Sequence, residues 1–229
     1  MTLIAFDIDD TLYLERDYAA SGFAAVGEYV YSRLGVTDFA DRAWELFANG
    51  ARRTIFNDVL DQLDIEQSQS LLEALVETYR AHSPSIQLLL DARQALDATA
   101  KYAQLAVVTD GPSRSQWAKV RALDLSQWTR HMVVTADLGQ QFVKPSPLAF
   151  LSLQVTLGEP SSSCCYIADN PLKDFSGPKQ LGWATLRVRR PGSLQEGRDS
   201  AADVDHEVAT LDDVSKNLPW AFGSGSGAT

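Results

Sequence analysis

Three carboxylates follow directly on a short apolar run at the start of the chain. Leu3 and Phe6 bound that run, and Asp7, Asp9 and Asp10 come within the next four residues. Acidic side chains so close together repel one another, and a nearby positive charge is a direct way to keep them ionised. A hard cation with oxygen ligands is therefore the first chemistry that this stretch suggests.

Polar side chains also end two later apolar runs. Thr109 ends "AVVT" and Asp169 ends "YIAD". In parallel α/β sheets, ligands bind beyond the carboxyl ends of the strands, at the point where the strand order reverses. Six side chains from distant parts of the chain are therefore expected to meet at one edge: Asp7, Asp9, Thr109, Lys144, Asp169 and Asp174.

This set combines four carboxylates with one hydroxyl and one ammonium group. Mg²⁺ fits it, because Mg²⁺ takes one or two carboxylates, keeps several waters and shares the rest of its shell with a phosphate. Zinc does not fit, because no cluster of thiols and histidines accompanies the acids. Cys164 and Cys165 are adjacent in an apolar run and are predicted to be buried thiols.

Apolar runs and helical patterns alternate along most of the chain. Strands separated by helices of 10–15 residues indicate right-handed βαβ units and a parallel sheet. The predicted fold class is therefore α/β, a doubly wound parallel sheet. The expected strands are residues 2–8, 104–110, 131–137, 163–169 and 184–190.

An all-helical block interrupts this alternation after the first strand. Apolar residues recur at helical spacing from Tyr18 to Ala81, with no strand between them. The block is predicted to be a domain inserted into the sheet domain and to move as a lid. The predicted organisation is a core domain of residues 1–16 and 85–219, a helical cap of residues 17–84 and a flexible tail of residues 220–229.

Charge and hydropathy argue against several classes of partner. The formal net charge is −10, whereas proteins that bind a nucleic-acid polymer carry a basic face. No apolar stretch approaches the roughly 18 residues that a membrane span needs. The first residues lack the basic and apolar regions of a signal peptide, so a cytoplasmic protein is expected. Whether it is a monomer or a homodimer stays open.

Four segments resemble the ordered motifs of the haloacid dehalogenase (HAD) superfamily. They are "DIDDTLY", "VVTDG", "KPSP" and "ADNPLKD", and the resemblance covers roughly residues 3–190. Each lies at the expected strand end, and the helical block resembles the family's helical cap. The one departure is Ala168, where many members have glycine. The resemblance implies a Rossmann-like core and a phosphatase-type member of the superfamily.

The resemblance also implies a role for each side chain at the strand ends. Asp7 would be the nucleophile and form an aspartyl-phosphate, and Asp9 would protonate the leaving alcohol and then deprotonate the attacking water. The negative neighbour of Asp9 is expected to raise its pKa. Thr109 would hydrogen-bond a phosphoryl oxygen, and Lys144 would offset negative charge.

The remaining implied contacts concern the metal and the substrate. Mg²⁺ would be held by Asp7, Asp169 and Asp174, with the backbone carbonyl of Asp9. Backbone N–H groups near Asp110 and Gly111 would bind phosphate. Within the cap, Arg52, Arg53 and Asn57 are either an exposed helical face or contacts to the rest of the substrate. Asp10 is expected to brace its loop instead of acting in catalysis.

The function predicted from these features is a Mg²⁺-dependent phosphatase acting on a small phosphorylated metabolite. A sugar phosphate or a nucleoside monophosphate suits a small closed site, as in a pyrimidine 5′-nucleotidase-like enzyme. The alternatives are a phosphomutase of the same fold and a non-catalytic binding domain on this scaffold. Dehalogenation is less favoured, because that chemistry needs no acid at Asp9.

Overall fold

The computed structural model describes residues 2–214, so the predicted tail and the last five residues of the predicted core lie outside the described part. The chain divides into two compact units. Residues 16–86 form one unit, and the other contains residues 2–15 together with the described residues from 87 onward.

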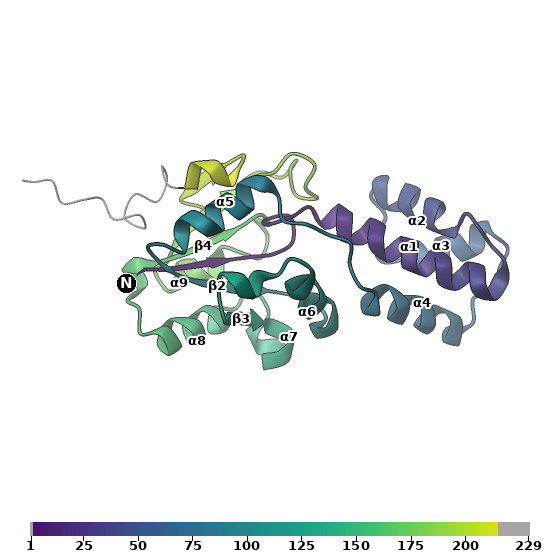
Figure 1. The fold of residues 1–229 in the computed structure, drawn as a ribbon, viewed down its shortest axis with the longest axis horizontal. Coiled ribbons are helices and arrows are strands. Elements are labelled where there is room, and N and C mark those ends of the chain that lie inside the picture. Colours follow the sequence, from purple (N-terminus) through teal and green to yellow (C-terminus); the bar gives the residue numbers. More distant parts are fainter. Residues whose placement is uncertain (1, 215–229) are drawn as a thin grey trace, which may run out of the picture. The chain divides into compact units, whose positions relative to one another are not determined.

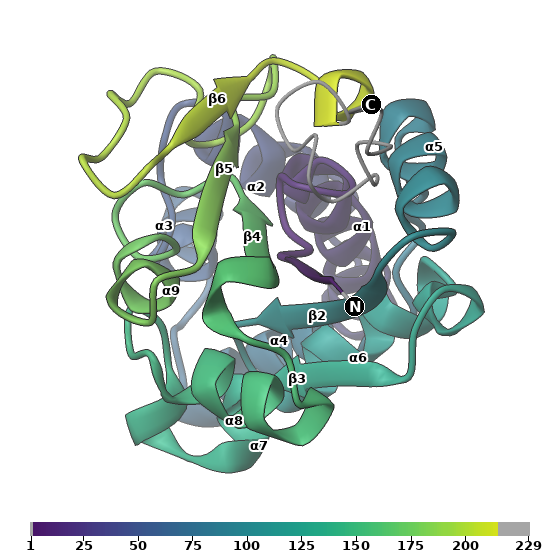
Figure 2. The same ribbon diagram turned by 90° about the vertical axis from the view of Figure 1, so that its left-hand side faces the viewer.

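The larger unit contains a parallel sheet of six strands in the order β3-β2-β1-β4-β5-β6. Strand β1 lies between β2 and β4, so the strand order reverses at β1 and the acids that follow it stand at the switch point. Figure 2 shows this order along the sheet. The strands are β1 Leu3–Phe6, β2 Gln104–Thr109, β3 His131–Val134, β4 Cys164–Ala168, β5 Ala184–Val188 and β6 His206–Val208.

Helices cover both faces of this sheet, with α5 and α6 on one side and α8 and α9 on the other (Figure 2). The predicted doubly wound α/β fold is therefore confirmed. The helices of this unit are α5 Leu90–Thr99, α6 Ser113–Ala122, α7 Thr135–Leu138, α8 Leu148–Leu157 and α9 Ser176–Gln180. Short 3₁₀ turns occupy Leu125–Gln127, Gln140–Phe142, Ser161–Ser163 and Leu211–Asp213.

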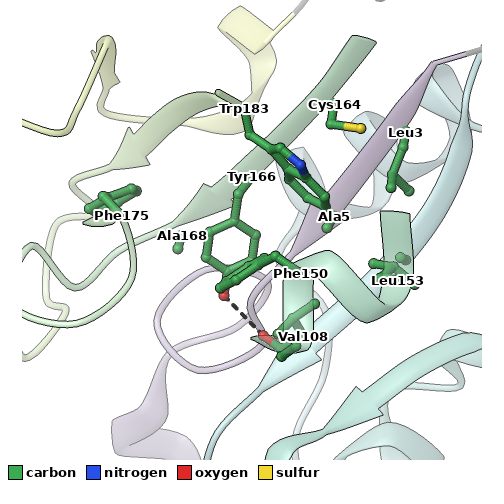
Figure 3. Packing of buried hydrophobic residues seen from close by; sticks show 12 residues of the cluster. Leu3, Ala5, Val108, Phe150, Leu153, Cys164, Tyr166, Ala168, Phe175 and Trp183 are labelled. Carbon is green, nitrogen blue, oxygen red and sulfur yellow. Dashed lines mark hydrogen bonds between the residues drawn. The ribbon is translucent and has the colours of Figure 1, made fainter. Parts of the chain in front are cut away.

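Aromatic side chains fill the core between α8 and the sheet. Phe150 of α8 packs edge-on against Tyr166 of β4, with ring centroids 4.7 Å apart, and against Trp183 at 5.6 Å. The Tyr166 hydroxyl donates to the carbonyl oxygen of Val108 at 2.9 Å, as the dashed line in Figure 3 marks. This bond satisfies the buried hydroxyl and ties β4 to β2 across β1. Cys164 and Cys165 are free, buried thiols, as predicted.

Two elements differ from the predicted ones. The strand expected over residues 131–137 ends at Val134, and its second half is the helix α7. Thr135 and Asp137 bond across to other elements there: the Thr135 hydroxyl donates to Asp110 and Asp137 accepts from the Trp117 indole. The sequence also did not predict β6, a three-residue edge strand in a polar segment.

The smaller unit is all-helical, as predicted for the inserted block, and its helices are visible in Figure 1. They are α1 Glu15–Leu34, which begins at the last residue of the other unit, α2 Phe39–Ala48, α3 Ile55–Gln62 and α4 Gln69–Ala81. Phe23, Phe56 and Tyr79 form their shared aromatic core, with centroids 5.5–6.2 Å apart. Gly35 ends α1 in the left-handed conformation, with φ of +71°.

Candidate active site

A buried lysine joins two of the predicted acids at the end of β1. The Asp7 amide extends the sheet by donating to the carbonyl oxygen of Ile167 at 2.9 Å. Lys144 Nζ lies 2.8 Å from Asp7 Oδ1 and 2.7 Å from Asp174 Oδ1, and it donates to the Tyr166 hydroxyl at 2.9 Å. All these side chains are buried. Residues far apart in sequence are thus brought to one point, as their strand-end positions predicted.

Asp7 and Asp174, the two acids in contact with Lys144, belong to a cluster of three carboxylates. One oxygen from each of Asp7, Asp169 and Asp174 lies within 4.8 Å of the others. Burial raises the pKa of Asp7 to about 6 against the opposing effect of Lys144. Burial, followed by the charges of Asp174 and Asp7, raises the pKa of Asp169 well above its ordinary value. Ionised together, the three carboxylates would carry more negative charge than Lys144 and the more weakly acting Lys173 balance.

This cluster fits a hard divalent cation. Its donors are all carboxylate oxygens, the ligand type that Mg²⁺ takes. Two of these acidic residues are also held by hydrogen bonds. The Asn170 backbone amide donates to Asp174 Oδ2 at 2.9 Å, and Arg187 Nε donates to the backbone carbonyl oxygen of Asp169 at 3.0 Å. Such outer contacts hold metal ligands in place. Asp7, Asp169 and Asp174 are the residues that would hold the ion.

Asp9 stands in a different environment from Asp7. Lys119 Nζ donates to both of its carboxylate oxygens, at 2.7 and 2.8 Å, and the Tyr13 hydroxyl also donates to it. Burial alone would raise the pKa of Asp9, but the Lys119 ammonium and its hydrogen bonds, helped by Tyr13, hold that pKa below its ordinary value. The predicted rise was therefore wrong, because the sequence did not reveal this cation.

Helix α6 carries a second contact to the same site. Thr109 Oγ1 donates to Gln116 Oε1 at 3.0 Å, and Gln116 Nε2 donates to Asp9 Oδ2 at 3.3 Å. Gln116 and Lys119 are three residues apart, so they share one face of the helix. The sequence analysis missed both, as it missed Tyr166. Their helical spacing directly after the "VVTDG" segment was the signal that could have revealed them.

Asp110 and Gly111 shape the loop between β2 and α6. Asp110 Oδ1 accepts from the Thr135 hydroxyl at 2.5 Å and from the Lys144 amide at 3.3 Å, so it joins this loop to the segment that carries Lys144. Gly111 has φ of +138°, and a Cβ there would meet Gln116 Nε2 at 2.5 Å. A side chain at this position would displace Gln116. The predicted phosphate contacts of both residues stay predictions.

Asp10 braces the loop after β1. Its carboxylate accepts from the backbone amides of Glu15 and Leu194, each at 2.8 Å. These contacts agree with the structural role expected for Asp10, and they leave the two acids on either side of Ile8 for chemistry.

The three predicted substrate contacts of the cap belong to the smaller unit. Arg52 Nη1 donates to the carbonyl oxygen of Phe47 at 2.7 Å, and its guanidinium group lies 4.3 Å from the centre of that ring. The Asn57 amide donates to Gln67 at 2.7 Å, and Arg53 is exposed. Arg52 and Asn57 thus have local contacts inside their unit, and contact of the three residues with a substrate stays a prediction.

The fold and the site define an α/β protein with paired acids, a buried lysine and a carboxylate cluster at the switch point of its parallel sheet. The sequence profile of the haloacid dehalogenase-like hydrolases matches residues 1–182. The chain therefore belongs to the haloacid dehalogenase-like hydrolase family, and the predicted resemblance is confirmed.

Relatives of this chain carry the name glyceraldehyde 3-phosphate phosphatase. The protein of that name from Pyrococcus abyssi is 23% identical over 97% of this chain and 95% of its own length. The Methanopyrus kandleri protein is 30% identical over 93 residues, which are 41% of this chain and 39% of that protein.

Solved structures share the fold over nearly the whole chain. A 2-haloacid dehalogenase from Pseudomonas syringae has a TM-score of 0.66 at 22% identity, covering 96% of this chain and 99% of its own. A HAD phosphatase from Thermococcus onnurineus has a TM-score of 0.63 at 21% identity, covering 95% and 98%. These likenesses establish the fold. Within the described residues, the longest apolar helical stretches fall short of a membrane span.

Proposed function

We propose that this HAD-family hydrolase is a Mg²⁺-dependent phosphatase that releases phosphate from a small phosphorylated metabolite. The observation that carries the proposal is that two acids at the end of β1 have different neighbours. Asp7 lies with Lys144 in the carboxylate cluster, whereas Asp9 is held apart by Lys119. Two acids in contrasting environments are the arrangement expected of a nucleophile and a proton carrier.

In the first step, an oxygen of Asp7 attacks phosphorus and the bond to the leaving oxygen breaks. Asp9 gives that oxygen a proton, so the product leaves as an alcohol and Asp7 becomes an aspartyl-phosphate. Lys144 stabilises the charge of the phosphoryl group as it moves, and so does the Thr109 hydroxyl once it turns from Gln116 to donate to a phosphoryl oxygen. A bound Mg²⁺ would supply further charge neutralisation at the phosphoryl oxygens.

In the second step, water attacks the phosphorus of the aspartyl-phosphate and Asp9 takes the proton. The P–O bond to Asp7 breaks, and phosphate and the free carboxylate are regenerated. Lys119 favours the ionised form of Asp9, which is the form that this step needs. The first step needs the acid form, so its proton must arrive with the substrate or from solvent.

The substrate class that we propose is a sugar phosphate, ahead of a nucleoside monophosphate. Relatives aligned over nearly the whole chain are named for a phosphorylated three-carbon sugar, glyceraldehyde 3-phosphate. The proposal rests on those names. A cytoplasmic location and a monomeric or homodimeric state stay predictions.

Phosphate release should require a divalent cation and stop in EDTA, because the carboxylates of Asp7, Asp169 and Asp174 would repel a phosphate that no cation accompanies. The measurement is phosphate release from a panel of sugar phosphates and nucleoside monophosphates, with Mg²⁺, with Ca²⁺ and with chelator. Full turnover in EDTA would refute the metal assignment. Mg²⁺ binding without turnover on any phosphate ester would favour a binding domain, and a requirement for a bisphosphate activator would favour a phosphomutase.

Replacing Asp9 by asparagine should slow phosphoryl transfer in proportion to the need of the leaving group for a proton. Loss of a general acid typically costs about 10²- to 10⁴-fold. We expect a loss in that range for an alkyl phosphate and a smaller one for an aryl phosphate with an acidic phenol. Single-turnover rates on both substrates measure the difference, and an equal fractional loss would mean that Asp9 is not the acid.

A further inference from the structure

We propose that Lys119 is a positioning residue that holds the Asp9 carboxylate on the leaving-group side of the site, away from the carboxylates that would bind the metal. The proposal rests on the proposed function, since it concerns the same two-step reaction. Lys119 lies outside the four motifs that carry the family resemblance, and it reaches the site from helix α6.

The geometry of the contact carries the first part of the argument. Lys119 Nζ lies 2.7 Å from one oxygen of Asp9 and 2.8 Å from the other, so the ammonium group makes a bidentate contact with the carboxylate. The Lys119 side chain is 4% exposed. A buried lysine loses its hydration, and it is normally placed in the interior only together with an anionic partner. Asp9 is its hydrogen-bonded partner, and the charge of Lys119 also acts on Glu15.

The neighbouring contacts restrict Asp9 further. Tyr13 donates to Oδ1, and Gln116 donates to Oδ2 while accepting from Thr109. Both oxygens are therefore engaged on the α6 side of the site. Gln116 also links Asp9 to the threonine that would bind the phosphoryl group, so α6 sets the two relative to each other.

The separation from the metal cluster carries the second part. Asp9 is two residues from Asp7, yet only the carboxylate of Asp7 joins the cluster with Asp169 and Asp174. A fourth carboxylate turning into that cluster could serve as an additional ligand, and it would then be lost as a proton carrier. The bidentate contact with Lys119 opposes this movement.

The test compares Lys119→Met with Lys119→Arg and with Arg121→Met, which removes an exposed positive charge from the same helix. Lys119→Met should lower kcat on an alkyl phosphate by roughly 10²-fold, the size of a lost general acid, with KM changed less than threefold. The loss on an activated aryl phosphate should be smaller. Lys119→Arg should recover part of the activity, and Arg121→Met should match the wild type.

A second arm uses the Asp9→Asn background, in which the carboxylate that Lys119 binds in the wild type is already absent. If Lys119 acts through Asp9, adding Lys119→Met to Asp9→Asn should change kcat by less than about twofold, because the two effects are not independent. A further large loss, or a rise in KM on both substrates, would mean that Lys119 contacts phosphate directly and would overturn the proposal. So would an equal fractional loss on the alkyl and aryl phosphates.

A binding measurement separates this proposal from the proposed function. Calorimetric titration of substrate-free protein with Mg²⁺ should show several-fold tighter binding in Lys119→Met, and this gain should disappear in Lys119→Met with Asp9→Asn. If Mg²⁺ binding stays tighter in the double variant, the gain reflects loss of a positive charge alone. If Mg²⁺ binding is unchanged in Lys119→Met, Asp9 does not reach the cluster. Either result overturns the proposal. Absence of wild-type turnover on all phosphate esters would instead count against the proposed function.

Discussion

Asp7→Asn is expected to lower kcat by several orders of magnitude. An amide is a poor nucleophile, so the aspartyl-phosphate cannot form and the two-step route closes. The substitution keeps the size of the side chain and leaves an oxygen that can still accept from Lys144, which lies 2.8 Å from Asp7. Lys144 also keeps Asp174 as a charged partner at 2.7 Å, so the site should hold its shape.

The folded state should not suffer from this substitution. Burial raises the pKa of Asp7 to about 6, so its ionised form is a cost to the metal-free protein at neutral pH. Asp7→Asn should therefore unfold at the same temperature as the wild type in EDTA, or higher. Asp199→Asn, at an exposed aspartate, is the control for the change in charge. Residual activity within about tenfold of the wild type, roughly 1.4 kcal/mol of barrier, would place the nucleophile elsewhere.

Lys144→Met should damage both activity and stability. Lys144 is fully buried between Asp7 and Asp174, and removing one partner of a buried ion pair typically costs about 3–5 kcal/mol, because the remaining charges are left uncompensated. Loss of phosphoryl-group stabilisation should lower kcat by about 10²- to 10³-fold, the size seen for a single electrostatic donor. Urea unfolding and kcat on one phosphate ester measure the two effects.

Mg²⁺ should restore part of the lost stability of Lys144→Met but little of its activity. The cation can neutralise the carboxylate cluster, whereas it cannot replace the ammonium contact to the substrate. Lys179→Met is the matched control, because Lys179 pairs with Asp205 at the surface with 37% of its side chain exposed. Such pairs contribute at most about 1 kcal/mol. A loss as small as this in Lys144→Met would show that the cluster does not depend on Lys144.

Local patterns were sufficient to predict which residues end the strands. A short apolar run closed by Asp7, Thr109 or Asp169 is visible without knowledge of the fold, and the carboxyl ends of parallel strands share one edge. The alternation of strands and helices likewise predicts the doubly wound sheet, because apolar residues recur with a different period in helices and in strands. These signals are local, so the sequence alone determined the fold class and the composition of the main acid cluster.

The environment of Asp9 was decided only by the tertiary structure. Lys119 is 110 residues from Asp9 in sequence, and its contact depends on β2 lying beside β1 and on which face α6 turns inward. The same holds for Tyr166, whose hydroxyl meets Lys144 only because β4 flanks β1 on its other side. A pKa follows from all the charges around a group, so the sign of the Asp9 shift could not be read from its neighbours in the chain.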